Sequence, residues 1–191
     1  MFIFDKKSVF YVYIHIPKNG GKEIRNELID DTENIEIISL WGYSENNNLD
    51  YAHIPYILRK TVILNNLDHI YFSYSRNPYN RIISAFFYIN PDKDIDDFKE
   101  FVITTLPTLD FPLHFIKKII HYYPQYLFVC DENLNMGCVS VSKLEDREKN
   151  REKIKTYNLA NYFTNEGLEV VNNVYEKDFL YFDYPMITDI I

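Results

Sequence analysis

Short apolar runs alternate along this chain with longer segments in which apolar residues recur at helical spacing. Apolar runs bounded by turn residues predict strands, at 9–14, 35–40, 69–74, 126–130 and 138–143. Helical spacing or a leading proline predicts helices, at 22–29, 55–60, 78–89, 98–106, 111–122, 145–155 and 164–175. Polar connections are expected at 42–50, 91–97 and 131–137. Because strands and helices alternate, the order predicts an α/β fold with a mostly parallel central sheet flanked by helices.

Composition narrows the class of protein. A chain of 191 residues with 47% hydrophobic residues can form a substantial core, and one domain over residues 1–191 is expected. The 17 Tyr and 14 Phe are expected to pack in that core rather than to stack on bases. The net charge of −8 disfavours nucleic acid as a partner, although a local cluster of Lys and Arg can still bind a small anion.

The expected location is the cytoplasm, with no membrane partner. No apolar run approaches the roughly 20 residues that a membrane span needs, and Asp5, Lys6 and Lys7 interrupt the N-terminal apolar residues before a secretory signal could form. Cys130 and Cys138 are expected to be free thiols in such a compartment. Two cysteines do not make a zinc site, and no metal is expected.

The loop after the first predicted strand has the sequence His15-Ile16-Pro17-Lys18-Asn19-Gly20-Gly21. A strand, a glycine-containing loop and a helix can together bind phosphate, because backbone N–H groups and the positive helix end face the anion. Gly20 and Gly21 allow a close backbone approach or a positive φ, and Lys18 offers a mobile positive charge. The loop is not a Walker A motif, because no Ser or Thr follows Lys22 to bind magnesium.

A second candidate anion site follows the strand predicted at 69–74. Pro78 suits the first position of a helix, so Arg76 is expected at the positive helix end, with Ser84 two turns into the helix on the same face. Arg and Ser suit a terminal phosphate, and Arg81 is expected either to help or to form a salt bridge. Loops at the carboxyl ends of parallel strands meet in one crevice, so the two loops predict a ligand with phosphate-like groups at two points.

Five segments resemble, in order along the chain, motifs of the PAPS-dependent sulfotransferases, in particular the heparan sulfate 2-O-sulfotransferase-like branch that sulfates carbohydrates. Residues 14–21 resemble the H-I-P-K-T-G-G loop of that family, and residues 75–86 resemble its R-N-P-Y-x-R-x-x-S-A-Y segment. Three later segments are similar to H-W-x-P-Q, F-E-D/N-L and Y-x-x-D-F-x-x-F-x-Y motifs; they are 121–125, 143–146 and 174–184.

The resemblance implies a single P-loop-like α/β domain that transfers a sulfuryl group from PAPS to an acceptor hydroxyl, releasing PAP, with no metal. The residues that it implies for the 5′-phosphosulfate are Pro17, Lys18, Asn19, Gly20, Gly21, Lys22 and Glu23. It implies that Lys18 stabilises the leaving phosphate, and that Arg76 and Ser84 bind the 3′-phosphate. Lys22 and Glu23 stand where the family has small polar residues.

His53 is the candidate general base. Its segment, A-H-I-P-Y, resembles the G-H-V/I-x-F/Y segment that carries the base in this branch. Histidine as a residue type suits proton transfer, because its unperturbed pKa is about 6.5. A hydrogen-bonded loop histidine is the alternative. His15 is expected to be structural, and His121 and Gln125 are candidates for the acceptor cleft. Glu145 is expected to orient a loop, to cap a helix or to form a salt bridge.

Two other functions remain open from the sequence. The first is a non-catalytic protein that keeps the sulfotransferase fold and binds a partner. Glu23 in the loop and the acidic composition favour this function. The second is an ATP-dependent small-molecule kinase, which the missing Lys-Ser/Thr pair disfavours. The acceptor is expected to be a hydroxyl compound, with a carbohydrate favoured by the resemblance.

Overall fold

The computed structural model describes residues 2–6, 9–30, 37–39, 42–44, 49–61, 69–113, 115–147 and 154–190. It mixes strands and helices, so the α/β class predicted from the sequence is confirmed. The chain divides into two compact units. Unit 1 comprises residues 1–75 and 125–142, and unit 2 comprises residues 76–124 and 143–191.

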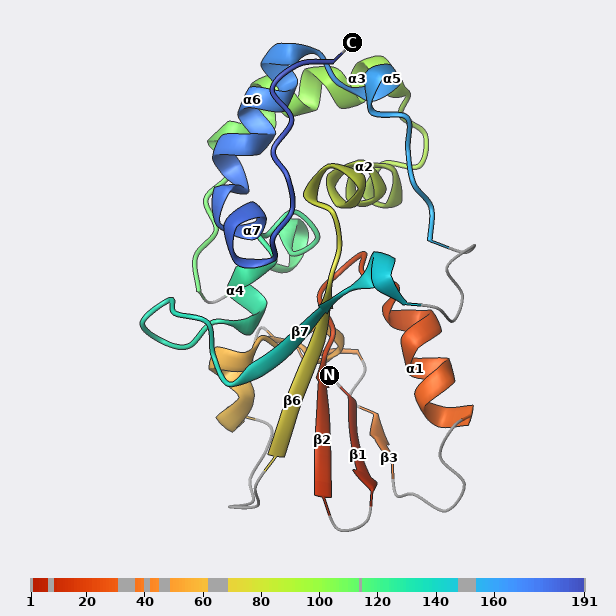
Figure 1. The fold of residues 1–191 in the computed structure, drawn as a ribbon, viewed down its shortest axis with the longest axis vertical. Helices are drawn as coiled ribbons and strands as arrows, with labels where there is room; N and C mark the ends of the chain where they lie inside the picture. Colours follow the sequence, from red (N-terminus) through yellow and green to blue (C-terminus); the bar gives the residue numbers. More distant parts are fainter. Residues whose placement is uncertain are drawn as a thin grey trace. The chain divides into compact units, whose positions relative to one another are not determined.

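Unit 1 is built on a five-stranded sheet with the order β3-β1-β2-β6-β7 (Figure 1). Its strands are β1 (Phe2–Lys6), β2 (Val9–Ile14), β3 (Ile37–Ser39), β6 (His69–Ser75) and β7 (Val139–Lys143). β1 pairs antiparallel with both β2 and β3, whereas β2 and β6 are parallel. The sheet is therefore mixed, and the departure from the mostly parallel expectation is due to β1, which the sequence pattern did not predict.

The carboxyl ends of β2 and β6 lie side by side. Ile14 is aligned with Ser73 in the parallel register, and the Ser73 hydroxyl donates a hydrogen bond of 2.7 Å to the Ile14 carbonyl. The loop after β2 therefore leaves the sheet beside the end of β6. Val12 and Ile14 are fully buried, so this end of the sheet is also part of the core.

Helical segments and a short hairpin also belong to unit 1. Helix α1 (Gly21–Asp30) confirms the predicted first helix, and η2 (Tyr56–Thr61), expected as a helical turn, is a 3-10 helix. β4 (Tyr43–Ser44) pairs with β5 (Leu49–Asp50) inside the predicted polar connection, and η1 (Tyr51–His53) follows. Residues 35, 36 and 40 of the predicted strand 35–40 lie outside the described residues, and so do residues 45–48 of the predicted polar connection 42–50.

The strand predicted at 126–130 is wrong, because the first four of these residues form the helix α4 (Tyr126–Val129). Leu127, Phe128 and Val129 are all buried, and a short apolar run that is buried all round cannot be distinguished as strand or helix by its periodicity. The backbones of Cys130 and Met136 form an isolated antiparallel β-bridge across the predicted turn. Cys130 is buried and Cys138 is exposed, and both are free thiols as expected.

Unit 2 is helical, with an aromatic core. Its helices are α2 (Pro78–Ile89), α3 (Ile95–Glu100), α5 (Leu159–Tyr162), α6 (Asn165–Val174) and α7 (Glu176–Tyr181). α3 continues through the π-helical turn η3 (Phe101–Thr105) into the 3-10 turn η4 (Leu106–Thr108). Buried rings from these helices and their caps pack together in the core, as expected for the aromatic residues; they include Tyr79, Phe86, Phe98, Phe163, Tyr175 and Phe179.

The helix predicted at 111–122 is wrong where the structure describes it. Of residues 111–113 and 115–122, only η5 (Lys117–Ile119) is helical, and it is a single 3-10 turn. The Tyr123 hydroxyl bonds to Ile116 N and to the Pro112 carbonyl, which stabilises an irregular path. At 145–155 the described ends contain only η6 (Leu144–Asp146), and 148–153 lie outside the described residues.

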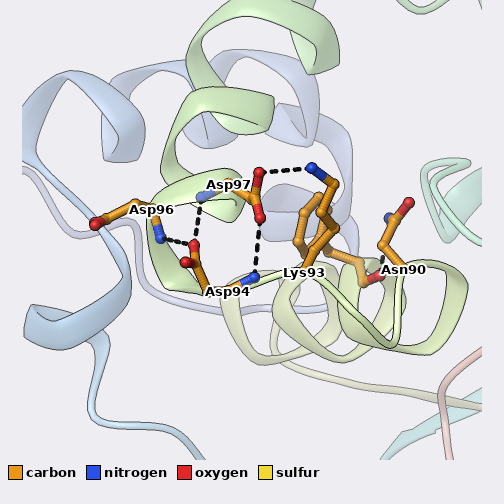
Figure 2. A network of polar contacts seen from close by, with 6 residues as sticks. Asn90, Lys93, Asp94, Asp96 and Asp97 are labelled. Atoms are coloured by element: carbon orange, nitrogen blue, oxygen red, sulfur yellow. Dashed lines mark hydrogen bonds and ion pairs between the residues drawn. The ribbon is translucent and has the colours of Figure 1, made fainter.

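The N-terminus of α3 explains why the acidic connection predicted at 91–97 is shorter than expected. The Asp94 carboxylate accepts hydrogen bonds from the backbone N–H groups of Asp96 and Asp97, and the Asp97 carboxylate accepts one from Asp94 N (Figure 2). This reciprocal capping box satisfies donors that a helix start leaves without partners. Lys93 Nζ lies 2.8 Å from the Asp97 carboxylate and lowers the pKa of Asp97.

Candidate functional site

The loop after β2 has the backbone geometry of a tight strand-to-helix connection. Lys18 and Gly20 both have a φ of 69°, in the left-handed region. A lysine is uncommon there, and backbone of this kind concentrates at functional sites. The Gly20 carbonyl accepts the first helical hydrogen bond of α1, from Ile24 N at 3.0 Å. The loop therefore leads directly into the helix, and the predicted succession of strand, loop and helix is present.

Asn19 fixes this loop inside unit 1. It is fully buried, and its Nδ2 donates to the Tyr74 carbonyl at 2.6 Å and to Gln125 Oε1 at 2.7 Å. Both N–H groups of the Asn19 side chain are thus engaged by the protein. Gln125, a candidate for the acceptor cleft, is fully buried and accepts this bond from Asn19.

Gly21, the first residue of α1, lies against the ring of His15. A Cβ on Gly21 would be 1.8 Å from His15 Nε2, far inside van der Waals contact. Since the φ of Gly21 is not left-handed, the absence of a side chain is required by this packing rather than by the backbone. His15 therefore has the structural role expected of it.

His53 lies beside the loop within unit 1. Asp50 accepts a hydrogen bond from Ala52 N at 3.0 Å and so stabilises η1, which carries His53. His53 is 9% exposed, and its ring centroid is 4.4 Å from that of His15. Its Nδ1 is 3.0 Å from the His15 carbonyl oxygen. Because a carbonyl only accepts hydrogen bonds, Nδ1 carries the proton, and the lone pair of neutral His53 is on Nε2.

The remaining loop candidates differ in exposure. Pro17 is buried, Lys18 and Gly20 are half-buried, and Lys22 and Glu23 are exposed on the first turn of α1. A negative charge near a helix N-terminus is favourable for the helix, so Glu23 has a simple local role. The structure brings His53 against His15, the residue at the start of the loop, from a separate part of the sequence.

Arg76 and Ser84, the candidates for a second phosphate, belong to unit 2. Arg76 directly follows β6, is 5% exposed, and donates from Nη2 to the Lys155 carbonyl. Burial lowers the pKa of Arg76, and Glu145 is among the groups that oppose this shift. Ser84 is half-buried in α2.

The N-terminus of α2 is capped by the protein itself. The Asn77 side chain accepts from Tyr79 N at 3.0 Å and from Asn80 N at 3.2 Å. Asn77 N donates to Glu145 Oε1 at 2.8 Å, and the Tyr184 hydroxyl donates to Glu145 Oε2 at 2.7 Å. Glu145 therefore bonds to Asn77, the N-cap residue of α2, and to Tyr184.

Arg81 is a structural group in unit 2. It is 1% exposed, and its Nη2 donates to the His121 carbonyl at 3.3 Å. Burial lowers the pKa of Arg81, while Tyr175 and the fully buried Asp178 raise it. A salt bridge was one of the two roles expected for Arg81, and Asp178 is the carboxylate whose charge acts on it.

Two contacts of the site carry no signal in the sequence. The Asn19–Gln125 hydrogen bond joins residues 106 positions apart, and the His15–Gly21 packing depends on the orientation of one ring. Neither follows from periodicity or from motif spacing. The loop and His53 themselves were found because glycines and a histidine in a family-like segment are visible in the sequence.

In the described part of the chain, no three His, Cys, Asp or Glu side chains are grouped so that they could hold a metal ion. Among the described helices, none has the length and hydropathy to cross a membrane. A scan against protein-family models found no match to this chain, and neither did searches of the curated proteins and of the solved structures.

Proposed function

We propose that the protein is a PAPS-dependent sulfotransferase that acts on an acceptor hydroxyl, with a carbohydrate as the acceptor class. The observation that carries the proposal is the loop after β2, in which Lys18 and Gly20 have left-handed backbone immediately before α1. The order of five family-like motifs along the chain supports it as well.

The loop supplies what a phosphosulfate group requires. Its backbone leads into a helix of ten residues, whose N-terminal N–H groups and dipole favour an anion. Lys18 adds a positive charge that is half-buried and therefore less screened than one in bulk water. In the proposed complex Lys18 stabilises the negative charge that develops on the leaving phosphate.

His53 is the proposed general base. The acceptor oxygen forms a bond to sulfur while the bond between sulfur and the 5′-phosphate oxygen breaks, and the electrons of that bond stay on PAP. The acceptor proton passes to His53 Nε2, the nitrogen that carries the lone pair while Nδ1 donates to the His15 carbonyl. His15 thus orients the base through its backbone.

The 3′-phosphate is assigned to Arg76 and Ser84 on the resemblance. An arginine offers paired donors to a phosphate, and binding would compete with the bond from Arg76 to the Lys155 carbonyl. The 3′-phosphate distinguishes PAP from ADP, so this assignment makes the choice of nucleotide the decisive test.

The first experiment compares the thermal midpoint with PAP, with ADP and with ATP plus magnesium. A ligand at about 100 times its Kd adds roughly 2.7 kcal/mol of stability, which shifts the midpoint of a chain of this length by about 5 to 10 °C. A shift with PAP that ADP does not match is expected. A shift only with ATP and magnesium would favour a kinase, and no shift with any of the three would favour a non-catalytic protein.

Two variants separate binding from chemistry. Arg76→Ala is expected to lose PAP binding, while the control Lys99→Ala, which removes a half-buried positive charge in α3, keeps it. His53→Ala is expected to keep PAP binding and to lose sulfuryl transfer, while His69→Ala at the start of β6 keeps both. Unchanged PAP affinity in Arg76→Ala would refute the 3′-phosphate assignment, and turnover in His53→Ala would refute the base.

A further inference from the structure

We infer that Asn19 is a positioning residue, which holds the anion loop in its binding geometry through Gln125 and the end of β6. The inference rests on the proposed function, because it assigns to Asn19 a role in nucleotide binding that does not involve contact with the nucleotide. The role implied by the sequence resemblance was direct contact.

The hydrogen bonds of Asn19 support an indirect role. Asn19 and Gln125 are both fully buried, and one Nδ2 group serves two acceptors, the Tyr74 carbonyl and Gln125 Oε1. The Tyr74 carbonyl can only accept, which fixes the orientation of the Asn19 amide. The other polar atom of the Asn19 side chain is Oδ1. An amide oxygen only accepts hydrogen bonds, so it cannot donate one to a phosphate oxygen.

The position of Asn19 explains what its tether controls. It lies between Lys18 and Gly20, the two residues of the loop with left-handed backbone. Unusual backbone persists only where the surrounding structure fixes it. The Asn19 side chain supplies two such constraints, one to the strand neighbouring β2 and one to Gln125 at the start of α4.

Loop order is tested first, without any ligand. Asn19→Ala and Gln125→Ala are each expected to raise the hydrogen-exchange rate of the backbone amides in 16–24 by about tenfold, the equivalent of one lost hydrogen bond. The control is Asn172→Ala, which also removes an amide that bonds a side chain and a carbonyl, those of Tyr79 and Ile187. The control is expected to leave exchange in 16–24 unchanged.

PAP affinity then distinguishes positioning from contact. Each single substitution is expected to weaken PAP binding about five- to tenfold, and the Asn19→Ala/Gln125→Ala double variant by no more than the larger single effect. Direct contact by Asn19 predicts instead that the two effects multiply. If Asn19→Ala does not fold, Gln125→Ala alone carries the test, since unchanged PAP affinity in that variant would overturn the inference.

The two readouts separate this inference from the proposed function. If wild-type protein does not bind PAP, the proposed function fails, and the positioning role is decided by the exchange rates alone. If wild-type protein binds PAP but exchange in 16–24 is the same in Asn19→Ala, in Gln125→Ala and in the Asn172→Ala control, the inference is wrong while the proposed function stands.

Discussion

At the scale of single residues, Gly21 shows how one side chain can impose a sequence requirement on another. An alanine at this position would place its Cβ 1.8 Å from His15 Nε2. We expect Gly21→Ala to destabilise the protein by about 1–3 kcal/mol, because the His15 ring or the start of α1 must move. Urea unfolding of the variant and the wild type measures this difference.

The His15→Ala background is the control for this prediction. Without the ring, the substitution is expected to be neutral or slightly stabilising, since alanine has a higher helix propensity than glycine. A loss of the same size with and without His15 would show that the steric account is wrong. Removing the His15 ring in this comparison also removes the neighbour of His53, because the centroids of the two rings are 4.4 Å apart.

The residue scale also shows what the sequence can supply about the site. The loop 15–21 and His53 are recognisable from residue type and local order. The protonation of His53 at Nδ1 and the tether from Asn19 to Gln125 depend on distances between separate segments. Such contacts arise only after the chain has folded, so no local pattern encodes them.

At the scale of elements, the capping box of α3 determines where that helix begins (Figure 2). We expect Asp94→Ala to lower the free energy of unfolding by about 1 kcal/mol, because Asp96 N and Asp97 N lose their acceptor. Chemical denaturation at neutral pH measures this effect, and Asp92→Ala, at an exposed position two residues earlier, is the charge-matched control. Equal losses in the two variants would contradict a capping role.

The pH dependence of this cap follows from Asp97. The hydrogen bond from Lys93 lowers the pKa of Asp97 in the folded state. A group with a lowered folded pKa stabilises the fold above its unfolded pKa of about 3.9 and loses that contribution as the pH falls through the folded pKa. The contribution of the capping box should therefore be present at neutral pH and decline in acid.

Elements were predictable from the sequence where a pattern and a boundary residue agree. α2 begins at Pro78 as predicted. The helix predicted from residue 164 begins as α6 at Asn165, with Thr164 as its cap. The pattern failed at 126–130, where burial on all sides removes periodicity, and at 111–122, where the Tyr123 hydroxyl stabilises an irregular segment. Tertiary contacts determine the secondary structure of such segments, and these contacts cannot be inferred from local sequence propensity.

At the scale of the whole molecule, β1 changes the sheet from mostly parallel to mixed. Its apolar stretch is only three residues long before Asp5 and Lys6, which is too short to predict a strand. Backbone pairing with both β2 and β3 makes it a strand in the fold. The parallel neighbours β2 and β6, whose ends precede both candidate anion segments, were predicted as individual strands.

The buried tyrosines predict how the whole molecule responds to alkali. Burial raises the pKa of several tyrosines, which include Tyr56, Tyr71, Tyr79, Tyr122, Tyr123 and Tyr175. In the unfolded chain these groups ionise near pH 10. A raised folded pKa therefore gives stability that is complete below about pH 10 and is lost as the pH rises, since the unfolded state then binds fewer protons.

Tyr175 should dominate this loss, because it is 1% exposed and donates a 2.7 Å hydrogen bond to the Tyr122 carbonyl. It alone is expected to remove about 1.4 kcal/mol of stability per pH unit above pH 10. Ultraviolet titration of tyrosinate in buffer should show two steps, an early one from accessible phenols and a later one that coincides with loss of circular dichroism. The same titration in concentrated urea should show one step near pH 10. A single step in buffer with the secondary structure intact would mean that the phenols in the core of unit 2 reach solvent without unfolding, contrary to the packing around Tyr175.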